Sequence, residues 1–287
     1  ASVSFGHGGK GSNQAVQAAR LGAAVSIVAA IGDDAAGDGA LALWREERID
    51  VAAVRRVADA ATGSATILVD PSGENAIVVA PGANDRLDAG AVAAAGSAIA
   101  AAALVLAQLE TPVAATIAAF EAARRAGATT MLNAAPVGAG VPRALLDLVD
   151  ILVVNEVEAA MLAGGFDSGS RGASALADHV GKAVLLTEGS RGATLYRNDG
   201  DALFQPAPQV VAADTTGAGD ALAGAFAARL SAGGDWPAAL RAGVAAGSHA
   251  CTGLGAVPSF GAATVIAAAC ARLPAAGTTS HAGAPPE

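Results

Sequence analysis

Apolar, β-branched runs alternate along this chain with segments of helical periodicity. From residue 103 onward the alternation is regular, because each predicted strand is followed by a helix or by another short strand. The predicted strands are 25–31, 65–70, 75–80, 103–108, 128–132, 150–154, 183–188, 193–196 and 202–205. The predicted helices are 12–22, 36–47, 88–101, 112–126, 142–148, 155–163, 171–180, 217–231, 235–252 and 261–271. This order predicts an α/β fold with a largely parallel sheet.

Two stretches depart from the alternation. Residues 51–80 contain short strands joined by turns, which predicts a small antiparallel addition such as a lid. The opening residues 1–6 are expected to add a half-exposed strand to it. The Pro- and Gly-rich residues 274–287 are expected to be a disordered tail. Since no linker or internal repeat is visible, residues 1–273 are predicted to form one domain.

Composition narrows the classes of partner. The formal net charge of −9 opposes binding to nucleic acid or to an anionic membrane. The uncharged stretch 89–107 is mostly Ala and Gly and divides into a helix and a strand, so no transmembrane helix is predicted. Cys251 and Cys270 have no metal-binding spacing, and residues 1–12 have no apolar signal-peptide core. We therefore expect free thiols and a cytoplasmic protein.

The segment GHGGKG (6–11) contains the G-x-G-x-x-G pattern of dinucleotide-binding loops, with the acidic pair Asp33 and Asp34 downstream. That pattern needs a buried strand before it, whereas the preceding segment is short and half polar. A phosphate-binding P-loop would need Ser or Thr at Gly11. Lys10 and the polar side chains at 12–14 favour a neutral ligand rich in hydroxyl groups. Dinucleotide binding stays open as the weaker alternative.

A second glycine motif, DTTGAGDALAGAF (214–226), leads into a long apolar helix. The amides of Gly217, Ala218 and Gly219 at a helix N-terminus form a typical site for phosphate oxygens. Asp220 follows in the first turn, where a carboxylate beside a phosphate is placed to take a proton from an attacking hydroxyl. The alternative is a glycine turn with an acid that only stabilises the helix dipole.

Two further motifs follow predicted strands. Asn155 and Glu158 lie three residues apart on one helical face, and a carboxylate there can hold Mg²⁺ on phosphates through water. The stretch LLTEGSRGATLY (185–196) is a strand entering a glycine turn. Its nucleotide-binding candidates are Thr187, Gly189, Ser190 and Gly192.

Together these motifs resemble the ribokinase-like (PfkB) family of carbohydrate kinases. The first signature is GGKGSNQAVQAARLGA (8–23) and the second is the motif at 214–226, with GDDAAGD (32–38), PGAN (81–84), QLE (108–110) and LNAAP (132–136) between them. The resemblance covers nearly the whole chain. It implies a three-layer α/β/α sandwich with a mainly parallel central sheet and a small β lid, and a homodimer joined through the lids.

The resemblance also implies an activity, the ATP-dependent phosphorylation of D-ribose at O5. The PGAN, QLE and LNAAP motifs are more similar to the ribose-specific members than to kinases of fructose or adenosine. Alternatives are a kinase of another sugar or nucleoside, such as fructose or deoxyribose, and a non-catalytic sugar-binding relative.

Residue roles carried over from the family are as follows. Asp220 would be the base, with Gly217, Ala218 and Gly219 as the anion hole. The sugar would be bound by Gly9, Lys10, Gly11, Asn13 and Glu110. ATP would be bound by Asn155, Thr187, Gly189, Ser190, Arg191, Gly192 and Gly219. Glu158 would help to place Mg²⁺, and an activating K⁺ would be held by Asp214, Thr216, Ala250, Gly253, Gly255 and Ser259.

Two departures from the family pattern bear on the fold and the site. The family usually opens with a strand and lid segment that carries a sugar-binding Asp, and the printed sequence has no counterpart before the first signature. Glu188 stands where the family often has an apolar residue. Because Glu188 is predicted to lie in a turn, we expect it to be solvated.

Overall fold

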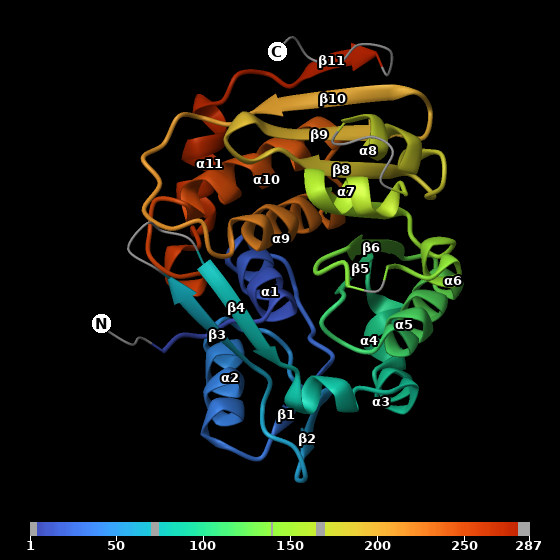
Figure 1. The fold of residues 1–287 in the computed structure, drawn as a ribbon, viewed down its shortest axis with the longest axis vertical. Helices are drawn as coiled ribbons and strands as arrows, with labels where there is room; N and C mark the ends of the chain where they lie inside the picture. Colours follow the sequence, from blue (N-terminus) through green and yellow to red (C-terminus); the bar gives the residue numbers. More distant parts are fainter. Residues whose placement is uncertain (1–4, 70–74, 139, 165–169, 281–287) are drawn as a thin grey trace.

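A computed structural model describes residues 5–69, 75–138, 140–164 and 170–280 (Figure 1). The strands are β1 Ala29–Gly32, β2 Val54–Val57, β3 Ser64–Val69, β4 Asn75–Ala80, β5 Leu104–Gln108, β6 Thr129–Asn133, β7 Ile151–Asn155, β8 Ala183–Thr187, β9 Gly192–Arg197, β10 Asp201–Pro206 and β11 Gly277–Ser280. The α-helices are α1 Lys10–Arg20, α2 Ala35–Glu46, α3 Ala89–Ala94, α4 Gly96–Ala101, α5 Val113–Arg125, α6 Arg143–Leu146, α7 Glu156–Leu162, α8 Ser170–Ala177, α9 Ala218–Ser231, α10 Trp236–Ala250 and α11 Ala263–Arg272. Short 3₁₀ helices are η1 Gly82–Arg86, η2 Gly189–Arg191 and η3 Val257–Ser259.

A seven-stranded sheet in the order β11-β10-β9-β8-β7-β6-β5 forms the centre of the molecule. Strands β5 to β8 pair in parallel, as the alternation with helices predicts. Strands β9, β10 and β11 extend it as an antiparallel meander. The four parallel strands therefore direct their carboxyl ends to one edge of the sheet.

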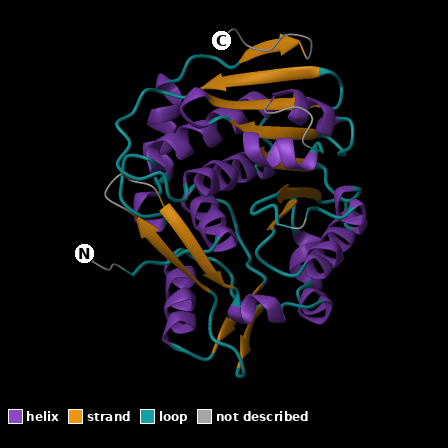
Figure 2. Ribbon diagram, viewed as in Figure 1, coloured by secondary structure: helices purple, strands orange, loops and turns teal. Residues whose placement is uncertain are grey.

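Helices cover both faces of this sheet (Figure 2). Strand β7 is buried on both sides: Ile151 joins the core formed with α1, α9 and α10, and the next residue, Leu152, joins the core formed with α5 and α8. In the sequence such strands are continuous apolar runs, so the hydrophobic pattern could locate them. The predicted three-layer α/β/α fold is confirmed.

Two smaller sheets complete the fold. Strands β1 and β2 pair in parallel with each other, and β3 pairs antiparallel with β4 as a hairpin. Figure 1 shows this hairpin standing apart from the seven-stranded sheet. The hairpin corresponds to the expected lid, although its extent differs from the prediction. Strand β2 lies outside it because β2 pairs with β1, and Phe5 and Gly6 lie in no strand.

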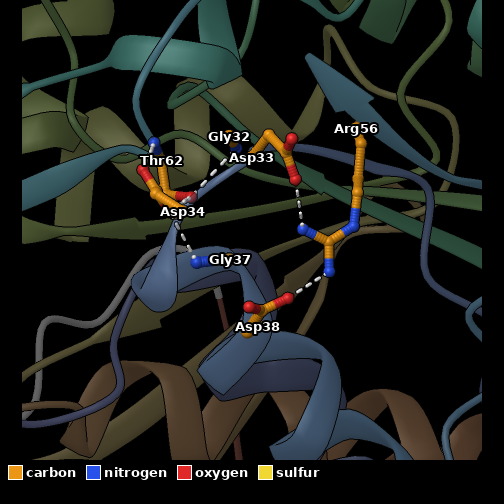
Figure 3. A network of polar contacts seen from close by, with 7 residues as sticks. All are labelled: Gly32, Asp33, Asp34, Gly37, Asp38, Arg56 and Thr62. Carbon is orange, nitrogen blue, oxygen red and sulfur yellow. Dashed lines mark hydrogen bonds and ion pairs between the residues drawn. The ribbon is translucent and has the colours of Figure 1, made fainter. Parts of the chain in front are cut away.

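The base of the hairpin is tied to β1 and α2 by a polar network (Figure 3). Asp34 caps α2 by accepting from the amide of Gly37 at 2.8 Å, and it also accepts from the amide and the hydroxyl of Thr62 at 2.8 and 2.6 Å. The Thr62 hydroxyl in turn accepts from the amide of Gly32. These bonds, first among them that from the Thr62 hydroxyl, hold the pKa of Asp34 below its usual value.

The neighbouring acid has a separate structural partner. Arg56 on β2 forms ion pairs with Asp33 and Asp38. Both acids of the pair at 33–34 therefore have partners within the fold. Asp34 is engaged by Thr62 and by the cap of α2, which weakens the dinucleotide alternative.

The C-terminal part corrects one expectation. Residues 277–280 form β11, which pairs antiparallel with β10, so a disordered tail from residue 274 is wrong for this segment. The reason is that β10 offers an edge of unpaired backbone groups, and the β-branched Thr278 and Thr279 favour the extended conformation that pairs with it. Residues 281–287 lie outside the described part of the chain, as do residues 1–4 of the predicted opening strand.

The two cysteines have the predicted state. Cys251 and Cys270 are free thiols, and burial raises the pKa of both. No helix in the described part of the chain combines the length and apolarity needed to cross a lipid bilayer.

Candidate active site

Each of the four parallel strands ends on a polar residue. These residues are Gln108, Asn133, Asn155 and Thr187, and they form two directly paired positions, 108 with 133 and 155 with 187. The carboxyl edge of a parallel sheet is where α/β proteins bind ligands. The site is therefore built along this edge.

The glycine loop enters a helix earlier than predicted. Helix α1 begins at Lys10, two residues before the predicted start, because Gly9 adopts the positive φ of 87° that turns the chain into the helix. The amide of Lys10, in the first turn, donates to Oε2 of Glu110 at 2.7 Å. Two of the predicted sugar-binding residues thus meet across 100 positions of sequence.

Helices α1 and α9 pack unusually closely. A Cβ atom on Gly224 of α9 would lie 2.4 Å from the carbonyl oxygen of Gln14, so only glycine permits this approach. The contact brings Asp220, in the first turn of α9, against the first turn of α1. The two signature motifs therefore form one site.

Asp220 is a buried acid, with 6% of its surface exposed. Its Oδ2 accepts from Nδ2 of Asn13 and its Oδ1 from Nε2 of Gln14, both at 2.9 Å. Burial raises the pKa of Asp220, while the nearby charge of Lys10 and the two amide donors act to lower it. A carboxylate with a raised pKa is a better proton acceptor than an exposed one.

Lys10 lies among three carboxyl groups from different parts of the chain. Its charge acts to lower the pKa values of Glu110, Glu158 and Asp220, although burial leaves each of them raised overall. The charge of Asp220 also acts to raise the pKa of Glu110. The predicted sugar, base and magnesium residues are thus electrostatically coupled to one ammonium group.

Asn13 carries a signal for a ligand. It is 5% exposed, and its Oδ1 is buried with no hydrogen-bond donor reaching it among the described residues. A buried amide oxygen without a partner costs free energy on the order of 1–3 kcal/mol. A ligand hydroxyl would satisfy it.

The predicted anion hole begins with a left-handed residue. Gly217 caps α9 with φ 78°, and a Cβ there would lie 2.7 Å from Cβ of Ala256. The amide of Ala218 donates to the carbonyl of Thr215 at 3.2 Å. The next amides, at Gly219 and Asp220, belong to the first helical turn, whose N–H groups have no intrahelical acceptor. A Cβ on Gly219 would meet nothing within 4 Å, so space lies next to them.

The predicted potassium residues come together behind Gly217. Oδ1 of Asp214 accepts from the amide and hydroxyl of Thr216, and Oδ2 accepts from the amide of Gly255 at 2.8 Å. A Cβ on Gly253 would lie 2.8 Å from Cβ of Ser259, and the carbonyl of Ala250 accepts from the amide of Gly253. Burial raises the pKa of Asp214, but the three donated bonds outweigh it and leave that pKa lowered. The atoms that could coordinate a cation here are carboxylate, hydroxyl and carbonyl oxygens, and oxygen ligands suit a hard cation.

Asn155 and Glu158 form a reciprocal capping box at the start of α7. The Asn155 side chain accepts from the amide of Glu158, and Oε2 of Glu158 accepts from the amide of Asn155, both at 2.8 Å. Among the described residues no cluster of three or more His, Cys, Asp or Glu side chains is arranged to hold a metal ion. Magnesium at Glu158 would thus rely on phosphate and water for its other ligands, as is usual for this ion.

The predicted nucleotide turn is fixed by ion pairs. Gly189 to Arg191 form η2 after Thr187, and Gly192 has φ 124° with its α-carbon against β10, where a Cβ would lie 2.1 Å from the carbonyl oxygen of Gln205. Arg191 pairs with Glu156 of α7 at 2.6 Å and with Glu188 at 3.5 Å. The turn is thereby joined to the start of α7, next to Asn155.

Glu188 corrects an expectation. Its side chain is only 4% exposed rather than solvated, and it accepts from the Thr194 hydroxyl at 2.6 Å. The turn itself begins one residue later, so Glu188 still faces the neighbouring strand β9. The hydroxyl and Arg191 together compensate for burying the charge.

Sequence reasoning missed several buried polar residues of α1. Gln14 and Gln17 are 1% and 0% exposed, and Arg20 donates to the carbonyls of Val257 and Phe260 while pairing with Glu47. The available signal was their spacing, because polar residues at 13, 14, 17 and 20 recur on one helical face.

Comparisons with known proteins agree with this architecture. Residues 1–261 match the pfkB family carbohydrate kinase model, and the chain belongs to that family. It is 40% identical over 235 residues to the ribokinase of Staphylococcus aureus, an alignment that covers 80% of this chain and 76% of that relative. It is 31% identical over 260 residues to the deoxyribokinase of Salmonella typhi, covering 89% and 85%.

A solved structure has the same fold. The structure of Arabidopsis thaliana ribokinase complexed with ribose and ATP matches with a TM-score of 0.80 and 30% identity, over 92% of this chain and 87% of that one. The chain is therefore a carbohydrate kinase by family and fold.

Proposed function

We propose that this protein transfers the γ-phosphoryl group of ATP to the 5-hydroxyl of D-ribose. One observation carries the proposal: Asp220 follows the proposed anion-hole glycines and accepts from Asn13 of α1, and this contact supports a buried base between the two proposed substrates. The identity to ribokinase supports ribose as the sugar, and the Arabidopsis complex supports ribose and ATP as the pair of ligands.

In this mechanism the hydroxyl oxygen attacks the γ-phosphorus, and the bond from that phosphorus to the ADP oxygen breaks. Asp220 accepts the hydroxyl proton. Lys10 offsets the charge of the surrounding carboxylates, and Asn13 Oδ1 accepts from a sugar hydroxyl. The amides at the start of α9 stabilise the charge on the transferred group, since catalysis here depends on positioning and electrostatics.

ATP and two ions complete the proposed site. Asn155, Thr187 and the turn 189–192 would bind the nucleotide. Mg²⁺ near Glu158 would neutralise phosphate charge, and K⁺ held by oxygens around Asp214 would order the loop before Gly217. Carboxylate and carbonyl oxygens are the ligands that both ions prefer.

The proposed base is tested by following ADP release with ribose, Mg²⁺ and K⁺ present. Asp220→Asn keeps the shape but cannot take the proton, so we expect turnover to fall by about 10²–10⁴-fold. Asp235→Asn is the matched control, because Asp235 caps α10 and a cap tolerates Asn. Near-normal turnover of Asp220→Asn would show that another group is the base.

A substrate panel tests the sugar. Ribose should give a higher kcat/KM than deoxyribose, fructose or a nucleoside; a clear preference for one of these would replace ribose by that substrate. Deoxyribose is the pertinent competitor because of the 31% identity to a deoxyribokinase. Calorimetric ribose binding without ATP turnover would instead indicate a non-catalytic binding protein.

We also propose a cytoplasmic homodimer that pairs through the β3–β4 hairpin. Ile67 and Val79 are exposed on one face of the hairpin, and Leu68 and Val78 on the other. A two-stranded hairpin is only marginally stable alone, and its exposed apolar residues on both faces favour contacts that bury each face. We propose that the substrate buries one face and a second copy of the chain buries the other.

A further inference from the structure

We propose that Gln14 is a positioning residue that fixes the carboxylate of Asp220 and keeps it ready to accept a proton, and that Gln108 holds Gln14 in place. This inference rests on the proposed function, because it takes Asp220 as the base. The geometry that carries it is a chain of two side-chain amides ending on the carboxylate.

The direction of this chain is set by chemistry. An ionised carboxylate only accepts, so Gln14 must present its Nε2 to Asp220, at 2.9 Å. Its Oε1 then faces the other way and accepts from Nε2 of Gln108. Gln14 thus uses both ends of its amide, and it has no freedom to rotate without breaking a buried bond.

Because of its surroundings, the Gln14 side chain cannot replace these partners with water. It is 1% exposed, and α9 lies so close that a Cβ on Gly224 would meet its carbonyl oxygen. Gln108, at the carboxyl end of β5, lies against Gly11, where a Cβ would be 2.8 Å from its Oε1. A Cβ at Gly11 would therefore displace the amide that orients Gln14, a role for Gly11 distinct from its predicted contact with the sugar.

Gln14 also differs in function from its neighbour Asn13. Both donate to Asp220, but Oδ1 of Asn13 has no partner within the described chain and is available to a ligand, whereas Gln14 has none of its groups free. Asn13 would both bind the sugar and position Asp220, whereas Gln14 would only position Asp220.

The consequence is a dependence of activity on pH. Besides the amides, the charged groups that act on Asp220 are Lys10 of α1 and Glu110 after β5, while Glu158 of α7 acts on Lys10. All of these remain in a Gln14 variant. Losing a donor to the ionised form raises the pKa of Asp220, so the base becomes protonated at a higher pH and the acidic limb of kcat moves upward.

The test compares Gln14→Met with Gln17→Met. Gln17 is the same residue one turn along α1, equally buried, but its Nε2 donates to the carbonyl of Gly261 at 3.0 Å. At saturating ribose and ATP, we expect the acidic limb of kcat to move up by about one pH unit in Gln14→Met. Gln17→Met should leave the limb in place, whatever its effect on thermal stability.

Gln108→Met supplies a second variant if Gln14→Met does not fold. It removes the donor that orients Gln14, so a smaller upward shift is expected. Coincident profiles of the folded Gln14 or Gln108 variant and the native protein would overturn the inference, as would an equal shift in Gln17→Met. If Asp220→Asn is inactive and no shift occurs, only the positioning role fails; if Asp220→Asn stays active, the proposed base fails.

Discussion

Glu188 is a buried charged residue directly after β8, whose first four residues, 183–186, are buried. Its carboxylate accepts from Thr194 on β9 and pairs with Arg191, which also pairs with Glu156. These partners link β8, β9 and α7 at the point where the nucleotide is proposed to bind. A single buried acid therefore connects the stability of the fold to the geometry of the turn.

Replacing Glu188 with Ala leaves the buried Thr194 hydroxyl without its acceptor. We expect the free energy of unfolding to fall by about 1–3 kcal/mol and KM for ATP to rise, with KM for ribose unchanged. Urea unfolding and steady-state kinetics measure the two effects. Glu188→Gln keeps an acceptor and should lose less; a KM for ATP that is unchanged in Glu188→Ala would contradict the link to the turn.

At the scale of elements, the catalytic arrangement depends on how closely α9 approaches α1. Gly224 permits the approach, and Asp220, one helical turn earlier on α9, thereby reaches Asn13 and Gln14. Sequence periodicity found both helices but could not find this contact. Whether Ser12 or Gln14 of α1 faces inward depends on a helix that follows 200 residues later in the chain.

Gly224→Ala tests the close approach. Since the new methyl group would overlap the Gln14 carbonyl, we expect α9 to be displaced, with a loss of about 1–3 kcal/mol of stability and a drop in kcat. Thermal unfolding and ADP release measure these. Gly96→Ala is the control, because a Cβ on Gly96 meets nothing within 4 Å and alanine favours a helix. Gly224→Ala with native stability and turnover would mean that the helices can separate without harm.

At the scale of the whole molecule, the sequence predicted most of the fold, because strands such as β7 and β8 are apolar on both faces and bounded by turns. It missed the pairing of β2 with β1 and of β11 with β10, since edge pairing depends on backbone groups rather than on a side-chain pattern. The motifs supplied the candidate site residues, but not the buried polar contacts of Gln14 and Glu188.

The two faces of the β3–β4 hairpin give a prediction for the assembly. Ile67→Ser with Val79→Thr changes one face, and Leu68→Ser with Val78→Thr changes the other. We expect one double variant to sediment as a monomer and the other to raise KM for ribose, because the faces would have different covers. Sedimentation velocity and kinetics distinguish them; a monomeric native protein, or a dimer unaffected by either pair, would contradict the proposed pairing.

The tie between Asp34 and Thr62 at the base of this hairpin bears on the entropy of ligand binding. A lid that is loose along its whole length must order many backbone dihedrals when it closes, and that cost is subtracted from the affinity for the ligand. Here the hydrogen bonds to Asp34 already order the strand's point of attachment. Closure would then restrict only the orientation of a preformed hairpin, so more of the interaction with the sugar would appear as affinity.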